Sequence, residues 1–110
     1  MVRKSVEICL VYITASDMEE AAAIGRILVE ERLAACANVH PPIRSIYRWE
    51  GAVAEDEEAV LIVKTRVDLV DRLTQRVLER HSYDCPCIVA LPVNGGNSAF
   101  LEWIEKETSA

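Results

Sequence analysis

A long predicted β-hairpin in the middle of the chain constrains the fold more than any other feature of the sequence. Side chains alternate between two faces from Ile43 to Glu50, Glu50-Gly51 is a turn signal, and residues 52–65 form a second extended segment. Each arm of this hairpin, 42–59, is about ten residues long, whereas typical strands have about five or six. A helix of about 14 residues spans only about 21 Å, so the helices of one chain are too short to cover the hairpin.

The hairpin therefore predicts self-association. An uncovered hairpin exposes an unpaired strand edge and several large apolar side chains, and both favour contact with another chain. The apolar side chains concerned are Ile43, Ile46, Tyr47, Trp49 and Val53. Addition of the hairpin to a neighbouring sheet would pair its edge. The alternative is a hairpin that folds back on the sheet of its own chain.

Strands and helices alternate along the rest of the chain. Residues 6–14 and the second half of 52–65 are nearly continuous apolar runs, which are typical of strands covered on both faces. Two overlapping capping boxes over 16–20 predict a helix that ends near Arg32. Gly25 lies on the apolar face of this helix, where it would allow a close approach to the sheet.

Three further elements follow from proline and apolar patterns. A short apolar stretch over 34–39 is followed by Pro41-Pro42, which cannot donate to a sheet ladder and so predict a bulge, an edge or a break. A second helix is predicted over 67–80, and it begins with a weak capping box over 65–68. A last strand is predicted over 88–93.

The resulting order is β-α-β-β-α-β, followed by a terminal helix that Asn97 or Ser98 caps. This order predicts an α+β fold of the ferredoxin-like, split β-α-β type, in a single domain over residues 1–110. The first and third strands are central in that topology. They are also the most continuously apolar strands of this chain, so the pattern and the topology agree.

Composition and charge exclude several classes of function. The chain has 12 Lys and Arg against 18 Asp and Glu, a net charge of −6, which makes it a poor binder of nucleic acid. No segment reaches the roughly 18–20 apolar residues of a membrane helix and no signal peptide is recognisable, so we expect a cytoplasmic protein without a membrane partner. The cysteines, Cys9, Cys36, Cys85 and Cys87, are then expected as free thiols or metal ligands rather than disulfides.

Two segments carry a specific resemblance to a known family. Residues 30–39, EERLAACANV, and 45–51, SIYRWEG, closely resemble the CutA family of divalent-cation tolerance proteins, as do the loop over 81–88 and the strand over 90–93. The resemblance covers about residues 6–107. It implies a ferredoxin-like fold, a tight homotrimer built through extended hairpin strands, a link to copper and other divalent cations, and kinship of architecture with the trimeric PII signalling proteins.

The chain departs from the family pattern at two places. Some members carry a cysteine implicated in copper binding near the end of the first strand, where this chain has Ile13, so that ligand is absent. The family's loop usually reads His-Pro-Tyr-Glu-x-Pro-Glu. Here Ser82, Asp84 and Cys87 replace its first Pro, its first Glu and its last Glu. The loop therefore loses one carboxylate and gains soft thiol ligands.

Cys85-Pro86-Cys87 makes this loop a candidate metal site. Proline favours extended geometry at the residue before it, and residues i and i+2 of an extended chain point the same way, so both sulfurs can face one ion. With His81 nearby and Cys36 as a further candidate, the ligands suit copper or another divalent metal ion such as zinc. The alternatives are burial of Cys36 behind the first helix and capping of the second helix by His81.

A cleft between subunits is expected around Trp49, Glu50, Lys64 and Tyr83, where the hairpin tip of one chain should meet the loop of its neighbour. Lys64 ends a buried strand and needs a carboxylate or a small bound anion as its partner. Interface packing with one salt bridge is the alternative interpretation. The acidic run over 55–58 is interpreted as a solvated edge that discourages aggregation.

No catalytic set emerges from the sequence, so we do not expect an enzyme. The first functional hypothesis is a trimeric cytosolic protein that binds copper or another divalent ion and takes part in the response to metal ions. The second is a PII-like small-molecule sensor or adaptor trimer with ligand clefts between subunits. The third is a purely structural oligomer.

Overall fold

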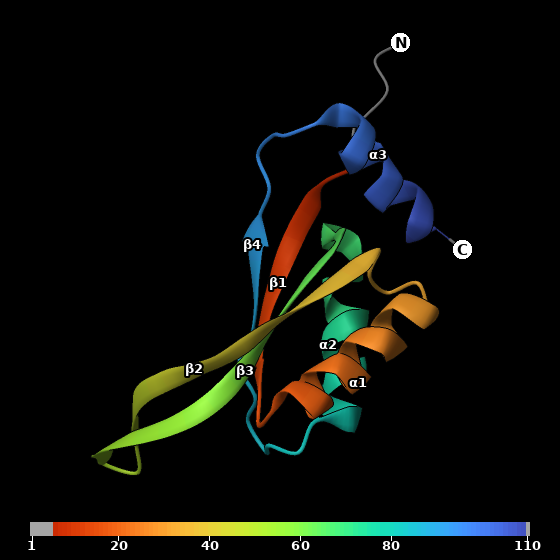
Figure 1. The fold of residues 1–110 in the computed structure, drawn as a ribbon. Helices are drawn as coiled ribbons and strands as arrows, with labels where there is room; N and C mark the ends of the chain where they lie inside the picture. Colours follow the sequence, from red (N-terminus) through yellow and green to blue (C-terminus); the bar gives the residue numbers. More distant parts are fainter. Residues whose placement is uncertain (1–5, 110) are drawn as a thin grey trace.

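The structure is a computed structural model that describes residues 6–109 (Figure 1). Within these residues the strands are β1 (Ile8–Ala15), β2 (Cys36–Trp49), β3 (Ala52–Arg66) and β4 (Ile88–Pro92). The helices are α1 (Met18–Glu30), α2 (Val70–Arg80) and α3 (Ser98–Glu107), and a short 3₁₀ turn, η1 (Val67–Leu69), leads into α2. The order of strands and helices is the one that the sequence pattern predicts.

The strands form one antiparallel sheet in the order β2-β3-β1-β4. Helices α1 and α2 lie together on one side of the sheet, whereas α3 lies near the start of β1, apart from the other two helices (Figure 1). The first and third strands are central, as their apolar runs predict. This arrangement of helices and sheet confirms the α+β class.

The main core lies between the sheet and helices α1 and α2. Alternate residues of β1 and β3 face these helices, and opposite pairs such as Val11 with Val63 and Ile13 with Leu61 are fully buried. Cys9 belongs to the same cluster, so its thiol behaves as a small apolar side chain.

Pro41 and Pro42 form a bulge in an edge strand rather than a break. β2 runs without interruption over Cys36–Trp49, but its register against β3 shifts between His40 and Ile43. β2 lies at the edge of the sheet, so there is no strand on its outer side that would need the N–H donors that the two prolines lack. The bulge separates the inner part of the hairpin, which packs on the core, from an outer arm that extends beyond it.

The outer arm of the hairpin ends in a two-residue turn. Glu50 and Gly51 have φ angles of 49° and 81°, and two positive values in succession suit the right-handed twist of the flanking strands. Trp49 pairs with Ala52 across this turn. The hairpin gives the chain an elongated outline of 55 × 25 × 23 Å, with the tip far from the helices (Figure 1).

Two predicted helix caps are present in the structure. The side chain of Asp17 accepts a hydrogen bond of 2.8 Å from Glu20 N at the start of α1. Asn97 accepts a hydrogen bond of 3.0 Å from Ala99 N at the start of α3. Both caps satisfy N–H groups that have no partner inside the helix.

The capping box predicted over 65–68 is wrong. Thr65 is fully buried, and its hydroxyl donates a hydrogen bond of 2.7 Å to the carbonyl oxygen of Leu33. The predicted helix over 67–80 therefore starts as η1, which has no side-chain cap, and α2 begins only at Val70. No helix in the described part of the chain is long and apolar enough to cross a membrane.

Gly25 allows α1 to approach the sheet closely, as the sequence predicts. A Cβ atom added there would lie 3.0 Å from Ala37 Cβ and 3.1 Å from Leu61 Cδ1. Overpacking of a filled core typically costs about 1–3 kcal/mol. Because valine adds two methyl groups beyond that Cβ atom, Gly25→Val is expected to lower the free energy of unfolding by at least about 2 kcal/mol.

Ala23→Val is the matched control for this prediction. Ala23 lies on the exposed side of α1, so the variant gains the same branched side chain without meeting the sheet. Thermal unfolding followed by circular dichroism compares the two variants. Equal melting temperatures would show that the sheet leaves room for a side chain at Gly25.

Candidate functional site

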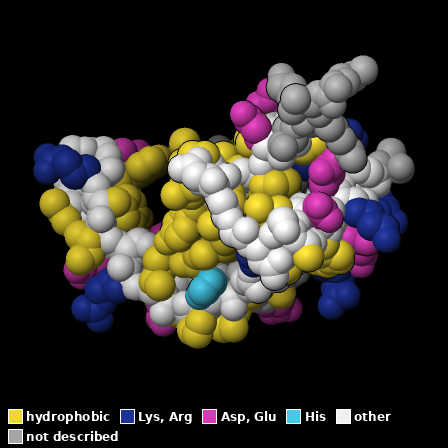
Figure 2. Space-filling view, turned by 90° about the horizontal axis from the view of Figure 1, so that it is seen from above, with side chains coloured by type: hydrophobic (Ala, Val, Ile, Leu, Met, Phe, Trp, Pro, Cys, Tyr) yellow, Lys and Arg dark blue, Asp and Glu magenta, His cyan; other side chains and the backbone are white. Residues whose placement is uncertain are grey.

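The sheet face opposite α1 and α2 carries an apolar surface. The strand register places Leu10, Tyr12, Ile62, Val89 and Leu91 together on this face, which we call the open face. Val89 and Leu91 are 51% and 47% exposed, and the other three are half-buried. Figure 2 shows hydrophobic side chains gathered in a continuous area near the centre of the view. A sheet face that meets water is normally polar, so an apolar one indicates a contact surface.

Lys64 lies on the same side of the sheet, towards the edge strand. It is opposite Cys36 in the register, and its Nζ donates hydrogen bonds of 2.5 Å to Asn38 Oδ1 and 3.4 Å to Cys36 Sγ. Among the described residues no carboxylate pairs with this ammonium group. Within the chain, Lys64 therefore contacts an amide and a sulfur in place of the carboxylate or anion that the sequence predicts.

The loop after α2 is held to β1 by His81. Its Nε2 lies 2.7 Å from the carbonyl oxygen of Thr14, and its Nδ1 lies 3.0 Å from the backbone nitrogen of Tyr83. Because the Tyr83 N–H can only donate, Nδ1 accepts, and Nε2 carries the proton that it donates to Thr14. Both ring nitrogens are thus engaged, and a metal could bind His81 only after one of these bonds is lost.

Tyr83 connects the same loop to the hairpin. Its hydroxyl donates a hydrogen bond of 3.0 Å to Glu58 Oε2. Burial and this carboxylate together raise the pKa of Tyr83, so the phenol stays protonated. Burial and the charge of Glu58 also raise the pKa of Cys87. The sulfur of Cys87 therefore remains a thiol until a metal ion or a base removes its proton.

Glu20, in the first turn of α1, holds the loop from the other side. Its Oε2 accepts a hydrogen bond of 2.9 Å from Ser82 N. Its Oε1 accepts bonds of 2.9 Å from Ser16 N and 3.0 Å from the Ser16 hydroxyl. Burial alone would raise the pKa of Glu20, but these hydrogen bonds to the charged form outweigh it and lower the pKa to about 2.

Glu20→Gln is expected to make the stability of the protein less sensitive to acid. A carboxyl whose pKa is lower in the folded chain stabilises the fold above its unfolded pKa of about 4.3. That contribution is lost as the pH falls towards about 2. The wild type should therefore melt at a higher temperature than Glu20→Gln at neutral pH, and the difference should shrink as the pH falls from about 5 to about 2.

Glu19→Gln is the control, because Glu19 is an exposed carboxylate in the same turn of α1. Thermal melts of the three proteins across this pH range give the measurement. A difference between wild type and Glu20→Gln that does not change with pH would assign the effect to the shape of the side chain and not to its charge.

The structure places the predicted metal ligands in two separate regions. Cys85 and Cys87 are free and exposed in the loop, and His81 anchors that loop. Cys36 is half-buried beside Lys64 on the side of the open face, so the predicted burial behind the first helix is wrong. Within residues 6–109, no three His, Cys, Asp or Glu side chains form a group that could hold a metal ion. An ion at the thiol pair of the loop would therefore need its remaining ligands from another chain or from solvent.

The four predicted cleft residues do not meet within one chain. Trp49 and Glu50 lie at the hairpin tip. Lys64 is opposite Cys36 at the other end of β2, which is roughly 40 Å away at about 3.3 Å per residue. Tyr83 bonds to Glu58, which lies roughly 20 Å along β3 from Lys64. A cleft that contains all four residues must therefore lie between chains, and it stays a prediction.

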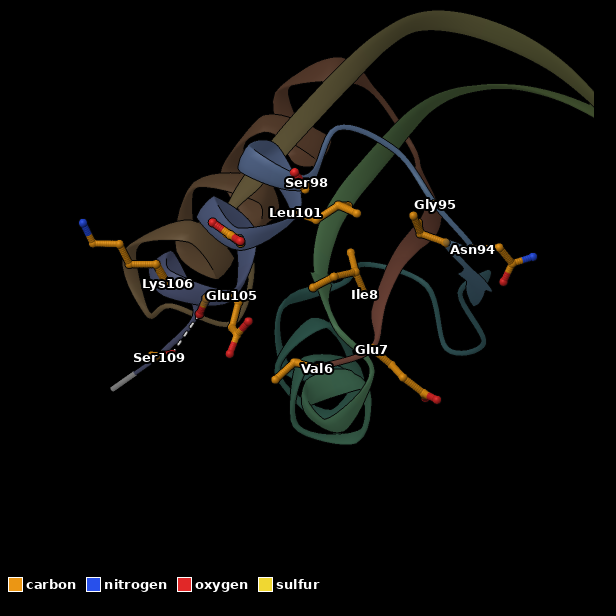
Figure 3. Close-up of a pocket in the computed structure, with 12 residues that line it drawn as sticks. Val6, Glu7, Ile8, Asn94, Gly95, Ser98, Leu101, Glu105, Lys106 and Ser109 are labelled. Carbon is orange, nitrogen blue, oxygen red and sulfur yellow. Dashed lines mark hydrogen bonds between the residues drawn. The ribbon is translucent and has the colours of Figure 1, made fainter. Parts of the chain in front are cut away.

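A separate cavity of about 840 Å³ lies between the start of β1, the loop before α3 and α3 itself (Figure 3). Ile8 and Leu101 line its apolar part, and Glu7, Glu102 and Glu105 are also among its lining residues. In Figure 3 the side chain of Glu7 points away from α3. None of the predicted metal or cleft residues lines this cavity, so it is distinct from the candidate site.

Sequence reasoning misses two residues of the site, Glu58 and Asn38. Glu58 is interpreted with the acidic run as part of a solvated edge, whereas the structure shows it half-buried and bonded to Tyr83. The alternation of side chains along the strand could have indicated that Glu58 is partly buried, since Glu58 lies two residues before the buried Val60 and shares its face. Asn38 is likewise two residues from Cys36 and lies on the same face.

Comparisons with known proteins extend over nearly the whole chain. A sequence model of the CutA1 divalent ion tolerance protein family matches residues 9–107. The chain is 48% identical over 99 residues to the divalent-cation tolerance protein CutA of Thermus thermophilus, which covers 90% of this chain and 96% of that protein. It is 43% identical over 105 residues to the chloroplastic protein CutA of Arabidopsis thaliana, and the match covers 96% of this chain but only 58% of that longer protein.

Solved structures of CutA proteins have the same fold. CutA1 from Oryza sativa superposes with a TM-score of 0.92 at 43% identity, over 96% of each chain. The periplasmic divalent cation tolerance protein CutA from Archaeoglobus fulgidus superposes with a TM-score of 0.90 at 40% identity, over 93% of this chain and 99% of that one. From the family match, the relatives and the shared fold, we conclude that the chain belongs to the CutA1 divalent ion tolerance protein family.

Proposed function

We propose that this protein is a homotrimer that binds copper or another divalent metal ion and takes part in the response to metal ions. The observation that carries this proposal is the pair of free, exposed thiols in Cys85-Pro86-Cys87, in a loop that His81 and Glu20 fix to the rest of the chain. The family is named for divalent ion tolerance, which is consistent with such a role.

The thiol pair suits a soft ion. Pro86 favours extended geometry at Cys85, so the two sulfurs can point to one side, and thiolates favour Cu(I) and Zn(II) over harder ions. Because the pKa of Cys87 is raised, binding must displace a proton, and uptake should weaken as the pH falls. Cys36 and His81 are left out of the proposed site, since an ammonium contacts the Cys36 sulfur and both nitrogens of His81 are engaged.

The proposed homotrimer is supported by exposed apolar side chains at two places. Val89 and Leu91 of the open face, and Ile46, Trp49 and Val53 of the hairpin, are each at least 47% exposed in the single chain. Repetition of one hairpin-to-sheet contact around a rotation axis would bury both surfaces in a closed ring. The strand order β2-β3-β1-β4 supports the ferredoxin-like topology, and the resemblance to the CutA family implies three copies in the ring.

We further propose a binding role, not a catalytic one, in the cytosol. The titratable groups around the loop act as anchors, because His81 and Glu20 bond backbone groups and Tyr83 keeps its proton. Free cysteines suit a reducing compartment. Relatives include proteins named as chloroplastic and periplasmic, so cell fractionation is the test of the proposed location.

A metal titration of the reduced protein, with the mass of the intact assembly measured in the same samples, tests the proposal. The expected mass is about three times the 12.3 kDa of one chain, and about one ion should be retained per chain. Native mass spectrometry reports both quantities. A particle of one chain at micromolar concentration would contradict the trimer, and protein without retained ions would contradict the metal role, so the two parts can fail separately.

A second function is favoured by the position of Lys64. Its ammonium lies beside the open face and, within the described residues, has no carboxylate partner. A half-buried cation of this kind is stabilised by a small anion. A PII-like sensor would hold that anion in a cleft between subunits. Tyr83, together with Trp49 and Glu50 from a hairpin tip, would surround the anion.

Lys64→Ala is expected to abolish any thermal shift that an anion produces. The wild type is first screened with nucleotides and organic anions, and each compound that raises its melting temperature is then tested on the variant, which should still take up copper. Lys106→Ala, an exposed lysine of α3, is the control. If no compound stabilises the wild type, the sensor hypothesis is contradicted. If the wild type also retains no metal, the hypothesis of a purely structural oligomer remains.

A further inference from the structure

We propose that Cys36 and Lys64 form a reversible sulfur–nitrogen bond when the protein meets hydrogen peroxide. The two residues face each other across β2 and β3 in the strand register. Lys64 Nζ lies 3.4 Å from Cys36 Sγ, in hydrogen-bond contact. Both residues belong to one chain, so the bond depends neither on the metal site nor on the trimer.

The surrounding contacts direct the amine at the sulfur. Asn38 lies two residues beyond Cys36 on the same face of β2, and its Oδ1 accepts a hydrogen bond of 2.5 Å from Nζ. This bond restrains a side chain that is otherwise flexible. The backbone is fixed as well, because Ala35 N donates to the Lys64 carbonyl oxygen at 2.9 Å. A nucleophile that is held against its target reacts faster than one that must diffuse to it.

Two steps form the bond. The Cys36 sulfur attacks one oxygen of hydrogen peroxide, so an S–O bond forms, the O–O bond breaks, one water leaves and a sulfenic acid results. The Lys64 ammonium group releases one proton to solvent, and the free amine that results then attacks this sulfur. The S–N bond forms, the S–O bond breaks, and the hydroxyl group leaves with one amine proton as a second water. Peroxide is thus reduced to water while the pair of side chains loses two hydrogen atoms.

A thiol reductant reverses the reaction. Two molecules of a small thiol reduce the S–N bond, which returns the Cys36 thiol and the Lys64 amine and leaves the reductant as its disulfide. Reversibility distinguishes this bond from the sulfinic and sulfonic acids, which small thiols do not reduce.

The other cysteines lack this arrangement. Cys9 is 2% exposed and lies in the core between the sheet and the helices, where peroxide has little access. Cys85 and Cys87 are exposed, but within residues 6–109 Cys36 is the cysteine whose sulfur has a lysine nitrogen in hydrogen-bond contact. The cross-link is therefore expected at this one pair.

The bond would change the surface beside the open face. The nitrogen of Lys64 loses its positive charge when it joins the sulfur, and β2 becomes covalently tied to β3. An oxidised chain would present an uncharged patch where the reduced chain presents a cation. Any small anion that depends on Lys64 would be released on oxidation.

Mass spectrometry of a Cys85→Ser/Cys87→Ser protein tests the proposal, because these substitutions remove the two exposed thiols that would form a competing disulfide. After treatment with hydrogen peroxide, the intact mass should fall by about 2 Da. Trypsin should no longer cleave after Lys64, and the peptide that contains Cys36 should remain joined to the peptide that contains Lys64. Dithiothreitol should restore both the mass and the cleavage.

Lys64→Arg, made in the same background, separates the cross-link from simple oxidation. Its guanidinium stays protonated and is a poor nucleophile, so oxidation should stop at the sulfenic acid, which dimedone labels at Cys36. Lys106→Arg should cross-link like its parent. Loss of about 2 Da in Lys64→Arg, dimedone labelling of the parent without any joined peptide, or an unreactive Cys36 would each overturn the proposal.

Discussion

Leu91→Glu is expected to convert the proposed homotrimer into single chains of 12.3 kDa. Leu91 lies on the open face, opposite Leu10 in the register, and is 47% exposed in the chain alone. In a symmetric assembly, one substitution places a carboxylate in every copy of the interface. Burial of each unpaired charge costs on the order of several kcal/mol, which shifts an association constant by orders of magnitude.

Leu78→Glu is the matched control for Leu91→Glu. Leu78 is a leucine of similar exposure, 43%, but it lies on α2 and outside the open face. This variant should keep the mass of the wild-type assembly. Sedimentation velocity at micromolar concentration measures the three proteins, and circular dichroism verifies that each is folded. An assembly that survives Leu91→Glu would require an interface elsewhere on the molecule.

Copper(I) uptake should be lost from the Cys85→Ser/Cys87→Ser protein. Serine hydroxyls are hard donors and do not replace thiolates as ligands of a soft ion. Among the described residues of the chain, no group of three His, Cys, Asp or Glu side chains is available to take over. The affinity of the loop for copper(I) should therefore fall by several orders of magnitude.

Cys36→Ser controls for the loss of a thiol as such. This variant should retain copper, because the proposed ion lies in the loop and the Cys36 sulfur is held against an ammonium. Competition with a chelator of known affinity, at neutral and at mildly acidic pH, measures uptake by the reduced proteins. The raised pKa of Cys87 predicts weaker binding in acid. Full uptake by the double variant would place the ion outside the loop.

The order of strands and helices could be predicted because each segment carries a local signal. Alternation, apolar runs and caps act over a few residues, and Asp17 and Asn97 cap their helices as expected. Thr65 shows the limit of such signals. The pattern over 65–68 is that of a helix cap, but burial beside Leu33 decides which group the Thr65 hydroxyl bonds. That outcome depends on contacts between segments far apart in the sequence.

The candidate site was less predictable than the fold. Residue types alone identify Cys85, Cys87 and Lys64 as groups with useful chemistry. They do not show which groups are close, because Cys36 lies opposite Lys64 only in one register of β2 against β3, and a shift of one residue would separate them. The sequence leaves His81 as a cap or a ligand. In the structure it is the C-cap residue of α2, and its ring bonds to β1.

The paired prolines of β2 limit aggregation at the edge of the sheet. A long edge strand is a template on which further strands add without end, as they do in amyloid fibrils. Pro41 and Pro42 have no N–H to offer such a strand, and the shifted register around them interrupts the ladder near the middle of β2. A ribbon with this interruption resists the growth of open-ended filaments, even in a crowded solution where its apolar surface favours association.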